Sequence, residues 1–105
     1  MIIVGDIGNT ETKICLVNSK NEIIKRISLS TKKINSSLLK KSILNLNKNN
    51  ILINKCLFCS VVPKSFIKIK KFFNKFYKIK CHELKKLNLP AGVEININVW
   101  HNFIN

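Results

Sequence analysis

The first strand-like segment of the sequence ends in residues whose types and spacing could hold phosphate. An apolar run reaches Asp6 and is followed by Gly8, Asn9 and Thr10, within MIIVGDIGNTETKICLV. A tight glycine turn leaves backbone N–H groups free to converge on an anion, and the Thr10 hydroxyl adds a donor. A carboxylate beside such a turn can hold magnesium through water, and Lys13 could supply a point charge. These five residues form a candidate phosphate site, with Asp6 as its metal ligand.

The same residue types also have a plain structural interpretation. Asp, Gly, Asn and Thr are common in hairpin turns because they favour tight backbone geometry, and Gly8-Asn9 is a pair typical of hairpins. On these residues alone both interpretations stay open.

The cysteines are a second group of residues that could carry chemistry. Cys56 and Cys59 form a C-x-x-C pair, and Cys15 and Cys81 complete the four cysteines of the chain. Structural zinc needs four converging ligands, but residues three apart on a strand face opposite sides. We expect buried, reduced cysteines at these positions.

The bulk composition points to a folded basic protein. The chain has 105 residues, 46% of them hydrophobic, and a formal charge of +14. Basic residues are spread along the whole chain, and isoleucine, lysine and asparagine have A/T-rich codons, so we do not expect nucleic acid to be the main partner. No run approaches the roughly twenty apolar residues of a membrane span, and Asp6 interrupts any signal-like start. We therefore expect a cytoplasmic protein that has no membrane partner.

The elements that would position these residues follow from hydrophobic periodicity. The segments 2–7, 12–17 and 22–29 predict three strands in a meander, and Leu39, Ile43 and Leu46 predict a helix from Ser36 to about Asn47. Both of the first two strands lack clean alternation, so we expect both faces of each to be covered.

The second half continues with strand and helix in alternation. The segment 51–62 predicts a buried strand, and Pro63 suits the first turn of a helix. That helix would turn one stripe of apolar side chains to the core. Further strands are expected over 77–82 and over 93–99, where apolar and polar residues alternate. The expected core stripe is Phe66, Ile69, Phe73 and Phe76. The order β-β-β-α-β-α-β predicts an α/β, ribonuclease-H-like lobe with a mixed sheet, spanning 1–105 as a single domain.

Three stretches of the chain resemble a known family. DIGNT is similar to the phosphate-binding signature of the acetate-kinase, hexokinase and actin superfamily, and is closest to type III pantothenate kinase. CSVVPKSFIKIKKFF resembles that family's Ser-Val-Val-Pro segment, which also joins a strand to a helix. LPAGVEININV loosely resembles the segment before its substrate loop. The first two occur in the family's order and at a similar spacing.

The resemblance implies ATP-dependent phosphorylation of pantothenate, the first committed step toward coenzyme A. It implies magnesium and a monovalent cation, K⁺ or NH₄⁺, as cofactors. Asp6, Gly8, Asn9 and Thr10 match the family's phosphate motif position by position. Trp100 would match the aromatic residue that contacts pantothenate if one residue is inserted.

The family's catalytic base is a feature that the sequence does not match. The base comes from a Gly-x-Asp-Arg motif, whereas Asp6 is the only aspartate of this chain and Arg26 its only arginine. We therefore expect an N-terminal half of the enzyme, from a truncated or split gene, that needs a complementing C-terminal lobe or self-association. The alternatives are a basic binding module without catalysis and a decayed fragment without activity.

Overall fold

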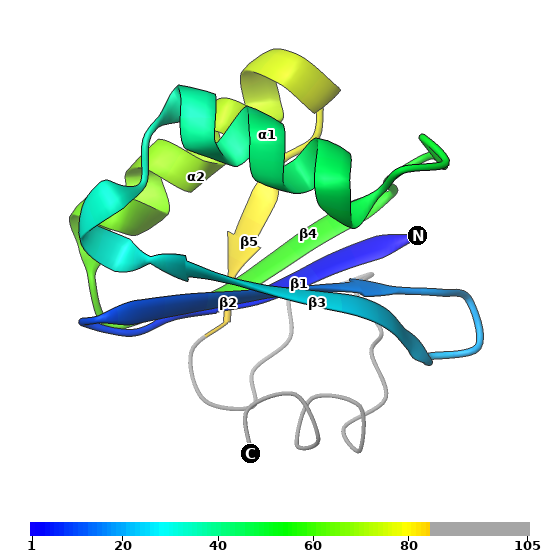
Figure 1. The fold of residues 1–105 in the computed structure, drawn as a ribbon, viewed down its shortest axis with the longest axis horizontal. Coiled ribbons are helices and arrows are strands. Elements are labelled where there is room, and N and C mark those ends of the chain that lie inside the picture. The colour runs from blue at the N-terminus through cyan, green and yellow to red at the C-terminus, as the bar shows by residue number, and fades with distance from the viewer. Residues whose placement is uncertain (85–105) are drawn as a thin grey trace.

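The computed structural model describes residues 1–84, which form a mixed five-stranded sheet with two long helices on one face (Figure 1). The predicted strand at 93–99 lies outside the described residues. The elements are β1 (Ile2–Ile7), β2 (Glu11–Val17), β3 (Ile23–Ser30), the short 3-10 helix η1 (Thr31–Lys33), α1 (Ser36–Leu46), β4 (Lys55–Ser60), α2 (Pro63–Tyr77) and β5 (Cys81–Glu83).

The strand order across the sheet is β3-β2-β1-β4-β5. The first three strands form an antiparallel meander, and β4 and β5 run parallel to β1. Each parallel strand follows a helix, as a parallel pair requires a crossover connection. This topology confirms the prediction of an α/β, ribonuclease-H-like lobe, because the strand meander and the two helical crossovers occur in the predicted order.

The main core lies between the sheet and the two helices. It contains fully buried residues from β1, β2, β4 and both helices, including Ile3, Ile14, Ile43, Phe58 and Phe73. A second cluster covers the opposite face of the sheet, and consists of the buried residues Val4, Cys15, Val17, Leu57 and Leu84. β1 and residues 14–17 of β2 are thus covered on both faces, as the uneven patterning predicts, whereas Glu11 and Lys13 near the start of β2 are exposed on one face. The edge strand β3 instead alternates half-buried and exposed residues.

The helix starts follow from recognisable capping residues. Asn35 precedes α1, and its side-chain oxygen accepts a hydrogen bond from the Leu38 N–H at 2.8 Å. Pro63 occupies the first position of α2, where a missing N–H leaves no bond unmade. Both starts agree with the prediction.

One residue of the predicted α2 stripe lies in a different environment. Phe76 is 42% exposed, and the buried position on its side of the helix belongs to Phe72. In the last turn of α2 the core contact is made by Tyr77, whose ring packs on Phe72 and Phe73, and not by Phe76. The Phe76 ring instead lies under the ammonium groups of Lys40 and Lys75.

Two predicted strands are shorter than expected. Residues 51–54 do not belong to β4, because the Asn47 side chain exchanges two hydrogen bonds with the Ile51 backbone and turns the chain there. Tyr77 belongs to α2, where its ring packs on Phe72 and Phe73, so β5 begins only at Cys81.

Neither helix within residues 1–84 has the length and apolar character needed to cross a bilayer.

Candidate functional site

The β1–β2 connection is a tight hairpin turn with Asn9 and Thr10 at its exposed tip. The Gly8 N–H donates to the Glu11 carbonyl at 3.0 Å and closes the turn. Neither tip residue has a positive φ, and Gly8 does not adopt the left-handed region either. The turn is therefore not one of the primed types that hairpins usually adopt, which need positive φ. Gly8 matters for space, because a Cβ there would lie 3.0 Å from the Glu11 carbonyl oxygen.

One N–H group of the turn already donates a hydrogen bond within the protein, whereas two others could donate to a ligand. The Gly8 N–H is engaged by Glu11, so it is not free as the sequence suggested. Within residues 1–84 no partner is recorded for the N–H groups of Asn9 and Thr10, and the Thr10 side chain is exposed. The donors that remain for an anion are thus at the tip.

A threonine from outside the hairpin holds the turn. The Thr31 N–H donates to the Thr10 carbonyl at 2.9 Å, and the Thr31 hydroxyl donates to the Gly8 carbonyl at 2.8 Å. The Thr12 and Thr31 hydroxyls are 2.8 Å apart and buried. Because the Thr31 proton is directed to Gly8, Thr12 is the donor in that pair. No pattern in the sequence singles out Thr12 or Thr31, since these contacts join positions 19 and 23 residues apart.

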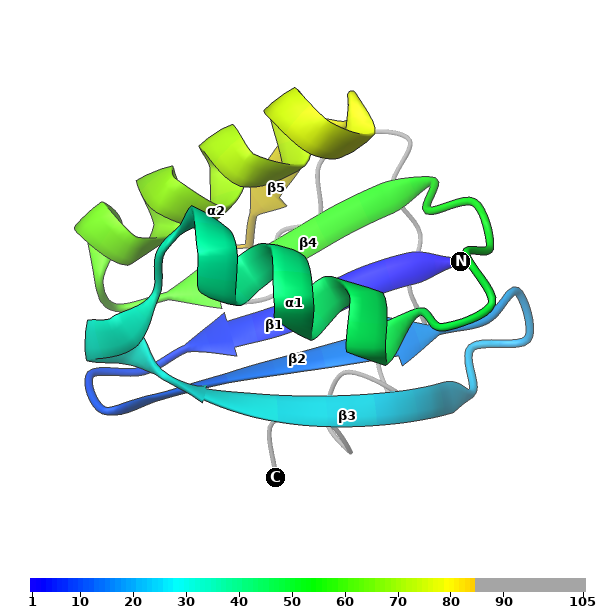
Figure 2. The same cartoon turned by 45° about the horizontal axis from the view of Figure 1, so that its top comes forward.

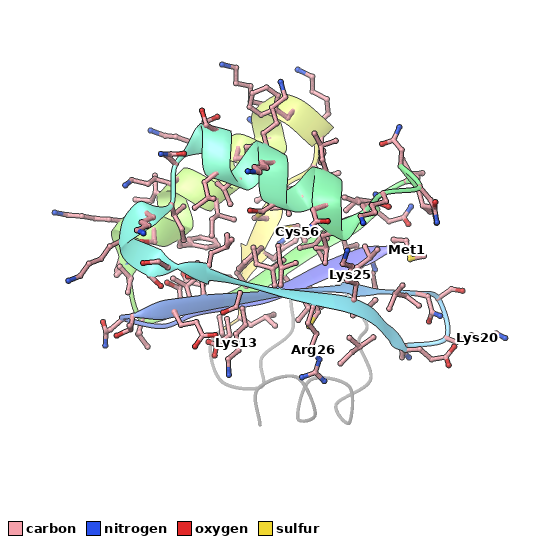
Figure 3. All side chains as sticks on the ribbon, viewed as in Figure 1. Met1, Lys13, Lys20, Lys25, Arg26 and Cys56 are labelled. Carbon is pink, nitrogen blue, oxygen red and sulfur yellow. The ribbon has the colours of Figure 1, made fainter. Side chains whose placement is uncertain are left out.

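Asp6 lies near the carboxyl end of β1, between Lys13 on β2 and Cys59 on β4. Directly paired strand residues share one face, and here it is the face away from the helices (Figure 3). Asp6 is half-buried, and the structure records no hydrogen bond to its carboxylate from residues 1–84. A half-buried carboxylate therefore lies beside an exposed ammonium-bearing side chain, as a metal and phosphate site would need.

The negative charges on this face affect the pKa of the neighbouring Cys59 thiol. Burial, followed by the negative charges of Asp6 and Glu83, raises the pKa of the Cys59 thiol. Its Sγ donates to the Leu84 carbonyl at 3.3 Å. Cys59 is thus a protonated neighbour of Asp6 at neutral pH.

Gly5 lies inside β1 and serves packing. An added Cβ would lie 2.0 Å from Cε2 of the Phe58 side chain, which is fully buried on the neighbouring strand. The missing side chain lets the Phe58 ring pack directly against the β1 backbone.

The two motifs that carry the family resemblance lie side by side. Ile7 pairs with Ser60, and the Val61 N–H donates to the Ile7 carbonyl at 3.0 Å. The Ser60 hydroxyl exchanges hydrogen bonds with the Val62 backbone at 3.0 Å, just before α2 begins. Both α1 and α2 begin at the edge of the sheet that carries the β1–β2 turn (Figure 2). The positive ends of both helix dipoles thus lie at this edge.

The charge distribution adds to this effect. The helices α1 and α2 carry seven lysines and no acidic residue, whereas every acidic residue among 1–84 lies on a strand or a strand connection. The positive field of the helix layer favours anions near its surface. No group of three or more possible metal ligands occurs among the described residues, so a metal at Asp6 would have fewer than three such ligands from residues 1–84.

The C-x-x-C residues lie on opposite faces, as the strand period requires. Cys56 belongs to the core under the helices and Cys59 to the cluster on the other face. The Cys56 Sγ lies 2.7 Å from the Sγ of Cys81, its partner on β5, and burial raises the pKa of Cys56 well above its usual value. These thiols are core residues.

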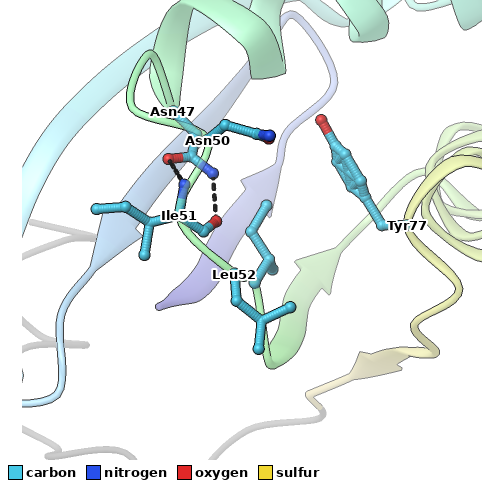
Figure 4. Close-up of a pocket in the computed structure, with 6 residues that line it drawn as sticks. Asn47, Asn50, Ile51, Leu52 and Tyr77 are labelled. Carbon is cyan, nitrogen blue, oxygen red and sulfur yellow. Dashed lines mark hydrogen bonds between the residues drawn. The ribbon is translucent and has the colours of Figure 1, made fainter.

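A pocket of about 290 Å³ lies at the other end of β1 (Figure 4). It is lined by Asn47, Asn50, residues 51–53 and Tyr77, and the Met1 amino group donates to the Leu52 carbonyl beside it. It shares no residue with the turn or with Asp6. The predicted substrate-binding residue Trp100 lies outside the described residues.

Comparison with known proteins gives three findings. Residues 2–102 match the sequence profile of the type III pantothenate kinase family. A type III pantothenate kinase of Pelagibacter ubique (strain HTCC1062) is 72% identical over 98 residues, which are 93% of this chain and 40% of that protein. The solved structure of the Lmo2764 protein from Listeria monocytogenes has a TM-score of 0.44 and 15% identity, over 78% of this chain and 34% of its own.

Proposed function

Because the chain belongs to the type III pantothenate kinase family, we propose that its β1–β2 turn binds the phosphates of ATP for transfer to pantothenate. The observation that carries the proposal is the pair of unpartnered N–H groups at Asn9 and Thr10, beside the half-buried Asp6 carboxylate. Backbone donors at a turn tip suit phosphate oxygens, and two helix N-termini at the same edge favour their negative charge.

The residue roles follow from this placement. The N–H groups of Asn9 and Thr10 and the Thr10 hydroxyl would donate to phosphate oxygens, while Gly8 keeps the approach to the turn free of a side chain. Lys13 shares the face of Asp6 and would neutralise phosphate charge. Trp100 stays a prediction for the pantothenate side.

Asp6 fits a magnesium ion that arrives with the nucleotide. A single half-buried carboxylate without a protein partner is a weak site for a metal by itself, but Mg²⁺ is commonly held by one or two carboxylates with phosphate oxygens and waters. When bound, the ion would neutralise charge that develops on the phosphates. The monovalent cation, K⁺ or NH₄⁺, is carried by the resemblance alone, because no described residue stands out as its ligand.

The chain spans 40% of the length of the Pelagibacter relative. We therefore infer that the described lobe supplies phosphate binding and that turnover needs a complementing lobe, which would bring the base for the pantothenate hydroxyl. A cleft closed between two lobes would also exclude water during transfer.

The test is a calorimetric titration of the 105-residue chain with ATP, in Mg²⁺ and again in EDTA. The wild-type chain is expected to bind more tightly in Mg²⁺, and Asp6→Asn is expected to lower that affinity about tenfold or more by removing the charge that holds the ion. The matched control is Glu22→Gln, a carboxylate at the opposite end of the meander that accepts from Asn18. It should bind as the wild type does.

Equal affinities of Asp6→Asn and wild type in Mg²⁺ would remove Asp6 from the site. Absence of any saturable ATP binding by the wild-type chain would refute the phosphate-binding role of the isolated lobe.

A further inference from the structure

We propose that Thr31 is a positioning residue, which orients the phosphate-binding N–H of Asn9 by holding the Gly8 and Thr10 carbonyls from behind. The inference rests on the proposed function of the β1–β2 turn. It starts from a contact that joins the end of β3 to the turn between β1 and β2.

The turn needs an external restraint. Its tip residues lack the positive φ of the primed hairpin turns, whose twist matches the twist of the flanking strands. The recorded bond across the turn is that from the Gly8 N–H to the Glu11 carbonyl. Asn9 and Thr10 are exposed and have no packing of their own to fix them. Such a tip would sample several orientations if nothing else held it.

Because the peptide bond is planar, the contact of Thr31 with the Gly8 carbonyl also sets the direction of the Asn9 N–H. The Gly8 carbonyl and the Asn9 N–H belong to one planar trans peptide, so they point in opposite directions. The Thr31 hydroxyl donates to that carbonyl at 2.8 Å. Holding the carbonyl toward Thr31 therefore aims the Asn9 N–H away from the protein, where a phosphate oxygen can accept from it.

The buried Thr12 hydroxyl is a second partner of Thr31. Because the Thr31 proton is donated to the Gly8 carbonyl, Thr12 is the donor to the Thr31 Oγ1 at 2.8 Å, and the bond from Thr31 to Gly8 does not depend on it. Thr12 is fully buried and Thr31 is 5% exposed, so water does not compete for either group. The Thr31 N–H bond to the Thr10 carbonyl, at 2.9 Å, holds the other side of the tip.

Three single variants of the full chain separate positioning from packing. Thr31→Val keeps the shape of the side chain and removes the hydroxyl, whereas Thr31→Ser keeps the hydroxyl and removes the methyl group. Thr12→Val removes a buried hydroxyl from the same pair but leaves the bond from Thr31 to Gly8. Thr31→Val leaves the Thr12 hydroxyl buried without its acceptor, which costs stability. If Thr31→Val does not fold for this reason, the double variant Thr31→Val/Thr12→Val is measured in its place.

Two readouts apply to each variant, at a temperature at which it is folded. The first is the ¹⁵N order parameter of the Asn9 amide without ligand, expected near about 0.85 in the wild type, Thr31→Ser and Thr12→Val, and falling toward about 0.6 in Thr31→Val. The second is the affinity for ATP with Mg²⁺, expected to fall roughly three- to tenfold in Thr31→Val alone, as for loss of one hydrogen bond.

If Thr31→Ser lowers the Asn9 order parameter and the ATP affinity and Thr31→Val does not, Thr31 acts through packing and the proposal is overturned. Equal loss of affinity in Thr31→Val and Thr12→Val would also overturn it. If the wild-type chain does not bind ATP, the proposed function of the turn fails for this chain, yet the order parameter still decides whether Thr31 holds the Asn9 peptide. An unchanged order parameter in Thr31→Val would refute that.

Discussion

The contact between Gly5 and Phe58 can be tested by adding one methyl group. In Gly5→Ala the new Cβ would lie 2.0, 2.4 and 2.7 Å from three atoms of the Phe58 ring. Ordinary carbon contacts are about 3.5–4.0 Å, so the ring would have to move by roughly 1.5 Å. Phe58 is fully buried and its ring centroid lies 6.3 Å from that of Phe73. The ring therefore has no open space into which it could rotate.

The expected loss follows from two opposing effects. Overpacking of a buried site destabilises by about 1–3 kcal/mol, and three contacts this short place Gly5→Ala near about 3 kcal/mol. Replacing glycine also restricts the unfolded chain, which offsets about 0.5–1 kcal/mol. The net loss in the free energy of unfolding is expected to be about 2–2.5 kcal/mol.

Equilibrium unfolding in urea, followed by far-UV circular dichroism, measures this loss. With an m value of about 1.5 kcal/mol/M, the midpoint should fall by about 1.5 M. Gly8→Ala is the matched control, because its Cβ would meet a single atom, the Glu11 carbonyl oxygen, at 3.0 Å. Its loss should stay below about 1 kcal/mol.

A double-mutant cycle identifies the ring as the cause. Phe58→Leu, a smaller side chain, should relieve the overlap, so that Gly5→Ala/Phe58→Leu is more stable than the sum of the single variants by about 1 kcal/mol or more. Additive losses, or a Gly5→Ala midpoint equal to that of the wild type, would refute the packing role assigned to Gly5.

Two further predictions concern α2 and the buried thiols. Lys78 caps α2 with φ 56° and ψ 33°, a left-handed conformation that strains any residue with a Cβ. Lys78→Gly should therefore raise the free energy of unfolding by about 0.5–1 kcal/mol, whereas Lys78→Ala should not; equal urea midpoints for the two would contradict this. Burial raises the pKa of Cys15 to about 11, although the Arg26 guanidinium lowers it. At pH 8 iodoacetamide should thus modify native Cys15 roughly 100-fold more slowly than Cys15 of the urea-unfolded chain, by peptide mass spectrometry; similar rates would contradict the burial.

The strands and helices were predictable where local chemistry determines them. Asn35 and Pro63 mark the helix starts through capping and a fixed φ, and the period of the apolar residues reveals α1 and most of α2. The errors occur where a distant contact decides. Residues 51–54 are apolar enough for a strand, but the Asn47 side chain binds the Ile51 backbone and the chain turns there. Phe76 has the spacing of the core stripe, but Tyr77 makes the core contact in the last turn of α2 and leaves Phe76 exposed.

In the candidate site, too, the residues that lie together in the sequence were predictable, and those that the tertiary fold brings there were not. Asp6 and the turn residues were identifiable because their types carry the chemistry and lie together in the sequence. The placement of Lys13 on the face of Asp6 followed only once the β1–β2 register was known, because a shift by one residue would turn it to the helices. Thr31 could not be predicted at all, since hydroxyl residues are frequent in connections and only the tertiary fold brings this one to the Gly8 carbonyl.

The position of the turn also explains why its surroundings are rigid. It joins β1 and β2, the two strands next to one another at the middle of the sheet, and the N–H of Val61, which follows β4, donates to the Ile7 carbonyl just before the turn. Behind it, Gly5 lets Phe58 fill the core up to β1, and Thr31 closes the remaining side. An anion site made from backbone donors has no side-chain rotamers to adjust, so its affinity depends on how well the backbone is held before the ligand arrives. Substitutions at Gly5 and Thr31 should therefore act differently, the first on stability and the second on the orientation of a donor.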